Sequence, residues 1–131
     1  MKLLLDTHIW IWSLADPHRL KSRVLKALEN PANEKWISPI SIWELMILVG
    51  KGRIRLNADV GEWIAQALQT APLREAPLTT EVVLATHKIH LPHRDPADAF
   101  LAATAKVFDL TLVTADTRLL AAKGISFLPN R

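Results

Sequence analysis

The chain has 131 residues, 50% of them hydrophobic, and a net charge of +3, which suits one domain spanning residues 1–131 and excludes extensive disorder. It contains no cysteine, so disulfides and thiolate metal sites are excluded and any metal would be held by oxygen or imidazole. No apolar run approaches the roughly 20 residues of a membrane span, and the leucines before Asp6 are too few for a signal peptide, so we expect a cytoplasmic protein.

The first predicted element is a buried strand. Leu3, Leu4 and Leu5 form a continuous apolar run that ends at Asp6 and Thr7. Strands covered by helices on both faces are continuously apolar. Ligands of such parallel sheets bind just beyond the carboxyl ends of the strands. Asp6 is therefore predicted to lie at the rim of a functional crevice.

Helical and extended patterns alternate along the rest of the chain. Helices are predicted at 8–14, 20–28, 41–49, 60–71, 79–89, 95–108 and 116–122, and further strands at 35–38, 73–78, 110–114 and 125–128. Alternation of this kind is typical of a three-layer α/β/α sandwich with a central parallel sheet.

Five acidic residues lie where the predicted elements join: Asp6, Glu44, Asp95, Asp98 and Asp116. Each has an ordinary explanation as part of a helix cap. Ser41 to Glu44 fits a capping box, and Asp95 before Pro96 fits a helix start whose dipole favours Asp98.

Four of these acids are also predicted to converge. Asp6, Glu44 and Asp116 follow three different strands, and Asp98 begins a helix that leads back into a strand. Right-handed connections bring such positions to one edge of a parallel sheet. Clustered carboxylates need a cation among them, and oxygen ligands suit Mg²⁺ or Mn²⁺. Because these acids would be confined to one site, the rest of the surface is more basic than the net charge suggests, which suits a nucleic-acid backbone.

The acidic motifs together resemble those of the PIN-domain ribonucleases, and in particular the VapC-type toxins of bacterial toxin–antitoxin pairs. The resemblance covers the whole chain and rests on Asp6 after a leucine-rich strand, Glu44 in a Ser-x-x-Glu helix start, His93-Arg94-Asp95-Pro96-Ala97-Asp98 and Val113-Thr114-Ala115-Asp116. It implies a metal-dependent endoribonuclease that hydrolyses RNA phosphodiester bonds to leave a 5′-phosphate, is neutralised by a VapB-type antitoxin and forms a homodimer.

The same resemblance assigns roles to individual residues. The acidic site would comprise Asp6, Glu44, Asp98 and Asp116, with Asp6 and Asp98 as the direct Mg²⁺ ligands. Ala99 stands where relatives often carry arginine, which puts in question a substrate contact from that position.

Several neighbouring polar residues have more than one interpretation. Thr7 and Thr114 would orient a carboxylate or a water, or serve the fold alone. His8, His90 and His93 are interpreted as having their hydrogen-bonding groups satisfied, or as facing phosphate, rather than as catalytic, with His8 in a hydrophobic neighbourhood.

Arg94 adjoins the acidic motif and is predicted to contact phosphate, whereas Lys26 and Lys51 are predicted to be solvated.

The helix predicted at 41–49 is apolar almost all round, so part of it is expected to meet a second copy of the chain or an antitoxin segment. Trp36 is predicted in the core, whereas Trp10, Trp12 and Trp43 would lie in the core or line a groove.

Two other functions fit acids at a sheet edge: a receiver-like domain that binds Mg²⁺ without cleaving anything, and a phosphotransferase of the haloacid-dehalogenase type. Receivers place paired acids after the first strand, and the phosphotransferases place a second aspartate two residues on. Thr7 and His8 follow Asp6 here, which disfavours both.

Overall fold

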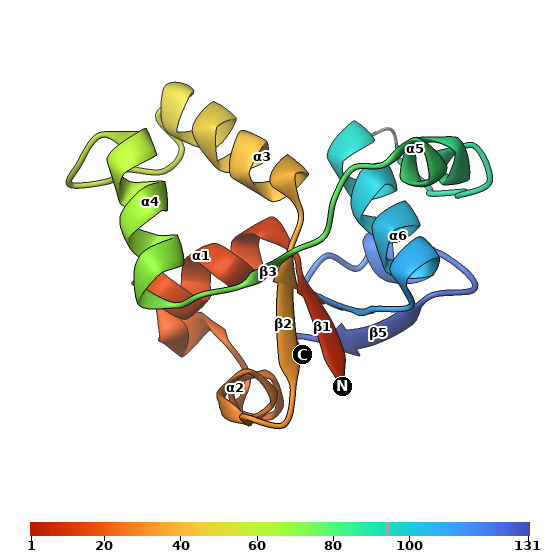
Figure 1. Ribbon diagram of the computed structural model, residues 1–131, viewed down its shortest axis with the longest axis horizontal. Helices are drawn as coiled ribbons and strands as arrows, with labels where there is room; N and C mark the ends of the chain where they lie inside the picture. Colours follow the sequence, from red (N-terminus) through yellow and green to blue (C-terminus); the bar gives the residue numbers. More distant parts are fainter. Residues whose placement is uncertain (94) are drawn as a thin grey trace.

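The computed structural model describes residues 1–93 and 95–131 and contains a five-stranded parallel sheet of order β3-β2-β1-β4-β5 (Figure 1). The strands are β1 Lys2–Leu5, β2 Glu34–Ile37, β3 Arg74–Glu75, β4 Thr111–Thr114 and β5 Ser126–Pro129. The apolar β1 is central, where Leu4 pairs with Trp36 on one side and Leu112 on the other.

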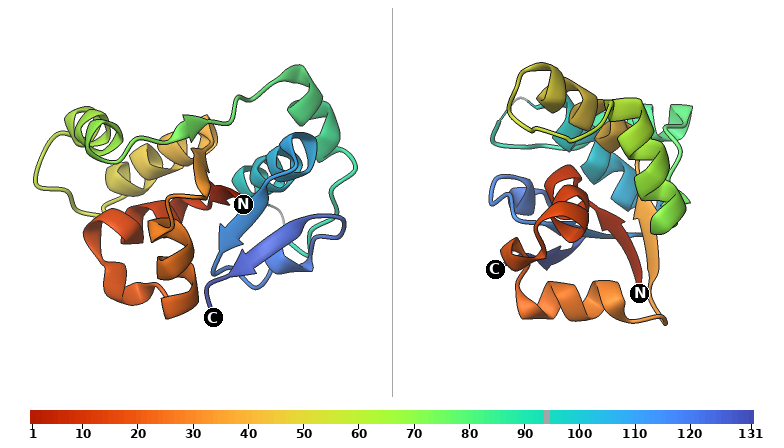
Figure 2. Two further views of the ribbon diagram at one scale, coloured as in Figure 1. Left: turned by 60° about the horizontal axis from the view of Figure 1, so that its bottom comes forward. Right: turned by 90° about the vertical axis from the view of Figure 1, so that its left-hand side faces the viewer.

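Helices cover both faces of the sheet. They are α1 Thr7–Ala15, α2 Ser22–Glu29, α3 Pro39–Gly50, α4 Val60–Thr70, α5 Thr80–Thr86 and α6 Pro96–Phe108, with short 3₁₀ helices η1 Pro17–Arg19 and η2 Leu119–Ala121. Figures 1 and 2 show α2 at the opposite end of the sheet from α3 and α4. None of the helices in the described part of the chain is long and apolar enough to cross a lipid bilayer.

The core divides according to the alternation of side chains along β1. Leu3 and Leu5 pack with Trp10 of α1 and Ile64 of α4 in one buried cluster. Leu4 joins a second cluster on the other face, with residues of α6 and η2. Successive strand residues point to opposite faces, so three leucines in a row supply both cores. The predicted three-layer α/β/α sandwich is confirmed.

One predicted helix is wrong. Residues 116–122 form a turn and η2 because the Asp116 carboxylate accepts the backbone N–H of Arg118, at 2.9 Å. That local bond stabilises a turn rather than a longer helix. Gly124 follows with a φ of 78°, a left-handed conformation that suits glycine.

The predicted capping box is also wrong. Helix α3 begins at Pro39, and the Ser38 hydroxyl caps it by accepting the Ile40 N–H, at 3.1 Å. Proline is favoured at the first helical position because its missing N–H costs nothing there. Ser41 is buried within the helix and Glu44 lies one turn farther along than the capping box requires, so Glu44 is free for another role.

The tryptophans divide between core and surface. Trp10 is buried, while Trp36 is only half-buried and packs against the α6-side core. Trp12 is half-buried against the other core. Trp43 is exposed on α3.

Candidate active site

The four predicted site acids meet in one cavity of about 460 Å³, which is lined by Asp6, Glu44, Asp98 and Asp116. Asp6 follows β1 directly, and its backbone N–H continues the sheet by donating to the Val113 carbonyl at 3.0 Å. Asp116 lies two residues beyond β4, the neighbouring strand. The predicted convergence is confirmed, whereas the chemical roles of these residues stay predictions.

Both oxygens of Asp6 are engaged. Oδ1 accepts the Thr7 N–H at 2.7 Å, as expected of the residue that caps α1, and Oδ2 accepts the Thr114 hydroxyl at 2.6 Å. Burial nevertheless raises the pKa of Asp6 to about 6, and the nearby Asp98 carboxylate adds to the rise. Asp6 is therefore a desolvated carboxylate whose hydrogen bonds to Thr7 and Thr114 do not offset the effect of burial on its pKa.

Glu44 reaches the site from the second turn of α3. Its carboxylate accepts the hydroxyl of Thr7, which lies 3.0 Å from the hydroxyl of Ser41. Burial raises the pKa of Glu44 despite the Thr7 hydrogen bond, and the charge of Asp6 acts in the same direction. Of the interpretations left open for Thr7 and Thr114, contact with a carboxylate is the one that these bonds support.

Asp98 is positioned by the start of α6. The Asp95 carboxylate caps this helix and accepts the N–H groups of Ala97 and Asp98, at 3.0 and 3.4 Å, so the capping interpretation of Asp95 is confirmed. Asp98 is only 5% exposed. Burial raises its pKa, while the hydrogen bond from His93 opposes the rise.

His93 is a neighbour that sequence reasoning did not assign to Asp98. Its Nε2 lies 2.6 Å from Asp98 Oδ2. Possible ligand atoms of His93, Asp98 and Asp116 all lie within 4.8 Å of one another. In the sequence, this contact could have been inferred only from the spacing of five residues between His93 and Asp98, across the start of a helix.

Asp116 differs from the other three acids. The Arg118 guanidinium contacts it through Nε and Nη2, at 3.3 and 3.2 Å. Partial burial raises the pKa of Asp116, but the Arg118 side chain and backbone N–H outweigh it, so the pKa lies below its usual value.

The remaining cavity wall carries both basic and aromatic side chains. Arg53, Arg118, His8 and Trp12 all line it. His8 is exposed, with its ring 5.6 Å from that of Trp12. The expectation that His8 points into a hydrophobic neighbourhood is therefore wrong, because the second position of α1 faces the cavity rather than the core.

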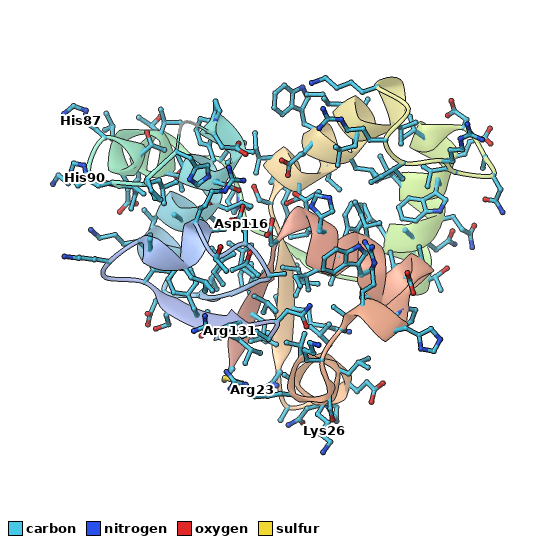
Figure 3. All side chains as sticks on the ribbon, turned by 180° about the vertical axis from the view of Figure 1, so that it is seen from behind. Arg23, Lys26, His87, His90, Asp116 and Arg131 are labelled. Atoms are coloured by element: carbon cyan, nitrogen blue, oxygen red, sulfur yellow. The ribbon has the colours of Figure 1, made fainter. Side chains whose placement is uncertain are left out.

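Basic side chains on α2 and around the end of α5 lie away from this cavity. In Figure 3, Arg23 and Lys26 on α2 and His87 and His90 around the end of α5 point away from Asp116. Lys26 and Lys51 are exposed, in agreement with a solvated position. The phosphate contact predicted for Arg94 lies outside the described residues.

The residues present fit a divalent cation. Burial raises the pKa of Asp6, Glu44 and Asp98, and the charge of a neighbouring carboxylate acts in the same direction on each, so a cation among them would stabilise their charged forms. The donors are carboxylate oxygens with one imidazole, which is compatible with Mg²⁺ or Mn²⁺. The site is thus a possible acidic metal centre.

A second surface feature lies on α3. Trp43 and Met46 are 53% and 48% exposed and border an apolar groove of about 520 Å³. Ile64 and Leu68 of α4 form another part of its lining. Helix α3 therefore has an exposed apolar side, and its expected contact with a second copy of the chain or an antitoxin segment stays a prediction.

Comparisons with known proteins agree with this geometry. A family model described as PIN domain matches residues 3–125. Ribonuclease VapC22 of Mycobacterium tuberculosis (strain ATCC 25618 / H37Rv) is 36% identical over 120 residues, which are 89% of this chain and 88% of that protein.

Solved structures share the fold at lower identity. VapBC2 from Rickettsia felis, bound to a DNA fragment from its promoter, aligns with a TM-score of 0.72 and 19% identity over 98% of both chains. DNA-bound VapBC from Salmonella typhimurium aligns with a TM-score of 0.69 and 18% identity over 100% of this chain and 99% of that one. The family predicted from the acidic motifs is confirmed, and the chain belongs to the PIN-domain family.

Proposed function

We propose that this protein is a metal-dependent endoribonuclease that hydrolyses RNA phosphodiester bonds as the toxin of a toxin–antitoxin pair. The observation that carries the proposal is the meeting of Asp6, Glu44, Asp98 and Asp116 in one cavity. Membership of the PIN-domain family and the likeness to a ribonuclease named VapC22 support it. An enzyme acting on cellular RNA would work in the cytoplasm.

The proposed cofactor is Mg²⁺, with Mn²⁺ as a substitute. Asp6 and Asp98 would be its ligands, because both are buried in the cavity and burial raises the pKa of each carboxylate, so that a cation there would stabilise their charged forms. His93 and Asp116 lie close enough to Asp98 to contribute. A bound divalent cation would supply a water of lowered pKa and a positive charge opposite the phosphate oxygens.

The chain's own residues would fix this arrangement before substrate arrives. Thr114 and Thr7 hold Asp6 and Glu44 through their hydroxyl groups, and preorganised groups need no rearrangement during reaction. Arg53 lines the cavity and is exposed, so it would contact a phosphate of the RNA. The receiver-like alternative lacks such support, because Thr7 and His8, rather than a second acid, follow Asp6.

The proposed partner is a VapB-type antitoxin. Structures with this fold include VapBC toxin–antitoxin complexes, and the groove beside Trp43 and Met46 offers an apolar surface for a helix of the antitoxin. A homodimer is also proposed, from the family resemblance alone. Replacing Trp43 with alanine should weaken co-purification with the protein encoded by the neighbouring reading frame, whereas unchanged co-purification would place the antitoxin elsewhere.

Incubation with three substrates tests the proposed chemistry. The purified protein, supplied with Mg²⁺ or Mn²⁺, should cleave RNA but neither a phosphomonoester nor acetyl phosphate. EDTA should stop cleavage and added metal should restore it. RNA cleavage that continues in metal-free buffer would exclude the mechanism, and hydrolysis of the phosphomonoester alone would exclude the assigned substrate.

A further inference from the structure

The cavity that holds the acidic residues has an aromatic wall that metal binding does not require. His8 and Trp12 lie one helical turn apart on α1 and both line this cavity. Their ring centroids are 5.6 Å apart and their planes are inclined by 53°. His8 is exposed while Trp12 is half-buried, so the outer part of the wall is open to a ligand.

The fold holds this wall in a fixed place. Asp6 caps α1 and so sets the direction of the helix from its first residue. Trp12 packs against the core, and the Arg19 guanidinium lies 5.1 Å from the centre of its ring. His8 therefore stands two residues after the Asp6 carboxylate, on a helix that packing and capping both secure.

The charges around the wall indicate the chemistry of the ligand. The site carboxylates, where a cation would hold a phosphate, line this cavity together with the exposed side chain of Arg53. A ligand that fills the whole cavity would combine a phosphate with a flat ring. A nucleotide within a single strand has both groups, since unstacked bases pack on aromatic side chains and backbone phosphates meet arginine.

We propose that His8 and Trp12 form a stacking subsite for the nucleobase next to the phosphate held at the acidic residues. This inference rests on the proposed ribonuclease function and adds to it the place where a base is held. Every base has an aromatic face, so the subsite contributes affinity for single-stranded RNA rather than selection of one sequence. His8 acts here through its ring rather than as a general base.

Binding measurements with four variants test the subsite. The probe is a fluorescein-labelled single-stranded RNA pool of random sequence, measured by fluorescence anisotropy with Ca²⁺ in place of Mg²⁺. Loss of one stacked base weakens binding by roughly tenfold, so we expect that increase in Kd for His8→Ala. His8→Phe keeps a ring and should recover most of the affinity, whereas His8→Lys keeps only a positive charge and should not. His87→Ala removes an exposed histidine that points away from the site in Figure 3 and should match the unmodified protein.

A second probe separates the base from the backbone. An RNA of the same length with abasic nucleotides should bind the unmodified protein and His8→Ala equally. Equal binding of normal RNA by these two proteins would overturn the subsite, as would recovery by His8→Lys but not by His8→Phe. If His8→Phe binds RNA normally but loses cleavage at saturating RNA, His8 has a chemical role and the proposal is wrong. Failure of the unmodified protein to cleave RNA would instead refute the proposed function.

Discussion

Asp6 and Asp116 follow neighbouring parallel strands, yet their carboxylates occupy opposite electrostatic environments. Burial raises the pKa of Asp6 to about 6, whereas the Arg118 guanidinium and backbone N–H hold the pKa of Asp116 below its usual value. Thr114 connects the two, because its hydroxyl accepts the Asp116 N–H at 3.0 Å and donates to Asp6 at 2.6 Å.

The difference shows that a shared position at the sheet edge does not give two acids the same role. Within residues 1–93 and 95–131, Asp6 is hydrogen-bonded to Thr7 and Thr114 and to no positive side chain, so its charge is available for a cation. Asp116 has its own arginine at the rim. We call the buried acids Asp6 and Asp98 the floor of the cavity, and Asp116 with Arg118 its rim. In the proposed enzyme the floor would hold the metal, and the rim would shape access to it.

The largest expected effect distinguishes substitutions of the buried acids Asp6 and Asp98 from substitution of Asp116. Asp6→Asn or Asp98→Asn should abolish RNA cleavage and leave the fold intact, with a loss greater than the roughly 10- to 100-fold caused by removing a residue that only orients a ligand. Asp116→Asn should cost about tenfold. Cleavage rates of variants with unchanged circular dichroism test this. Full activity in Asp6→Asn or Asp98→Asn would disprove the proposed site.

A smaller effect is expected at Thr114, whose hydroxyl hydrogen-bonds to both Asp6 and Asp116. Thr114→Val keeps the shape of the side chain but removes the donor to Asp6 and the acceptor for the Asp116 N–H, so cleavage should fall about tenfold. Thr114→Ser retains the hydroxyl and is the matched control. An equal loss in both variants would indicate that packing of the methyl group, rather than hydrogen bonding, is what matters.

The stability of the metal-free protein should change in the opposite direction from activity. Asp6→Asn removes a desolvated charge while its amide can still accept from Thr7 and donate to Thr114. We expect the free energy of unfolding in EDTA at pH 7.5 to rise by about 1 to 3 kcal/mol, given about 1.4 kcal/mol per pKa unit. Urea unfolding measures it, and a destabilised variant would mean that burial of Asp6 carries no cost.

The difference in the free energy of unfolding between Asp6→Asn and the unmodified protein should also depend on pH. The pKa of Asp6 rises from 3.8 to about 6 on folding, so between these values the folded state binds more protons and stability falls as pH increases. The advantage of Asp6→Asn over the unmodified protein should therefore grow from about pH 4 to pH 6 and level off above. An advantage that is constant across this range would contradict the raised pKa.

The sequence predicted the features that depend on local pattern. Continuous leucines before Asp6 placed the central strand, and Asp95-Pro96 placed the start of α6. The errors came from competition between neighbouring residues. Ser38 with Pro39 starts α3 earlier than Ser41 would, and a turn bond from Arg118 to Asp116 replaces a helix.

Contacts across the chain were harder to predict from spacing. The acids themselves could be assembled because parallel strands share one edge. The His93 contact to Asp98 depends on how a loop returns to a helix start, and the exposed position of His8 depends on the direction of α1. Neither the contact nor the exposure leaves a periodic pattern in the sequence, so only the folded structure shows them.

The smallest expected effect concerns the pair at the rim. Arg118→Ala should raise the pKa of Asp116 but change RNA cleavage by less than about threefold, because an exposed ion pair is weak and is screened by salt. Comparing the rates of Arg118→Ala and the unmodified protein at low and high ionic strength tests this, and the small difference should shrink as salt increases. A loss as large as that of Asp98→Asn would mean that Arg118 contacts the RNA directly, and the distinction drawn between floor and rim would then have to include a substrate-binding role for this arginine.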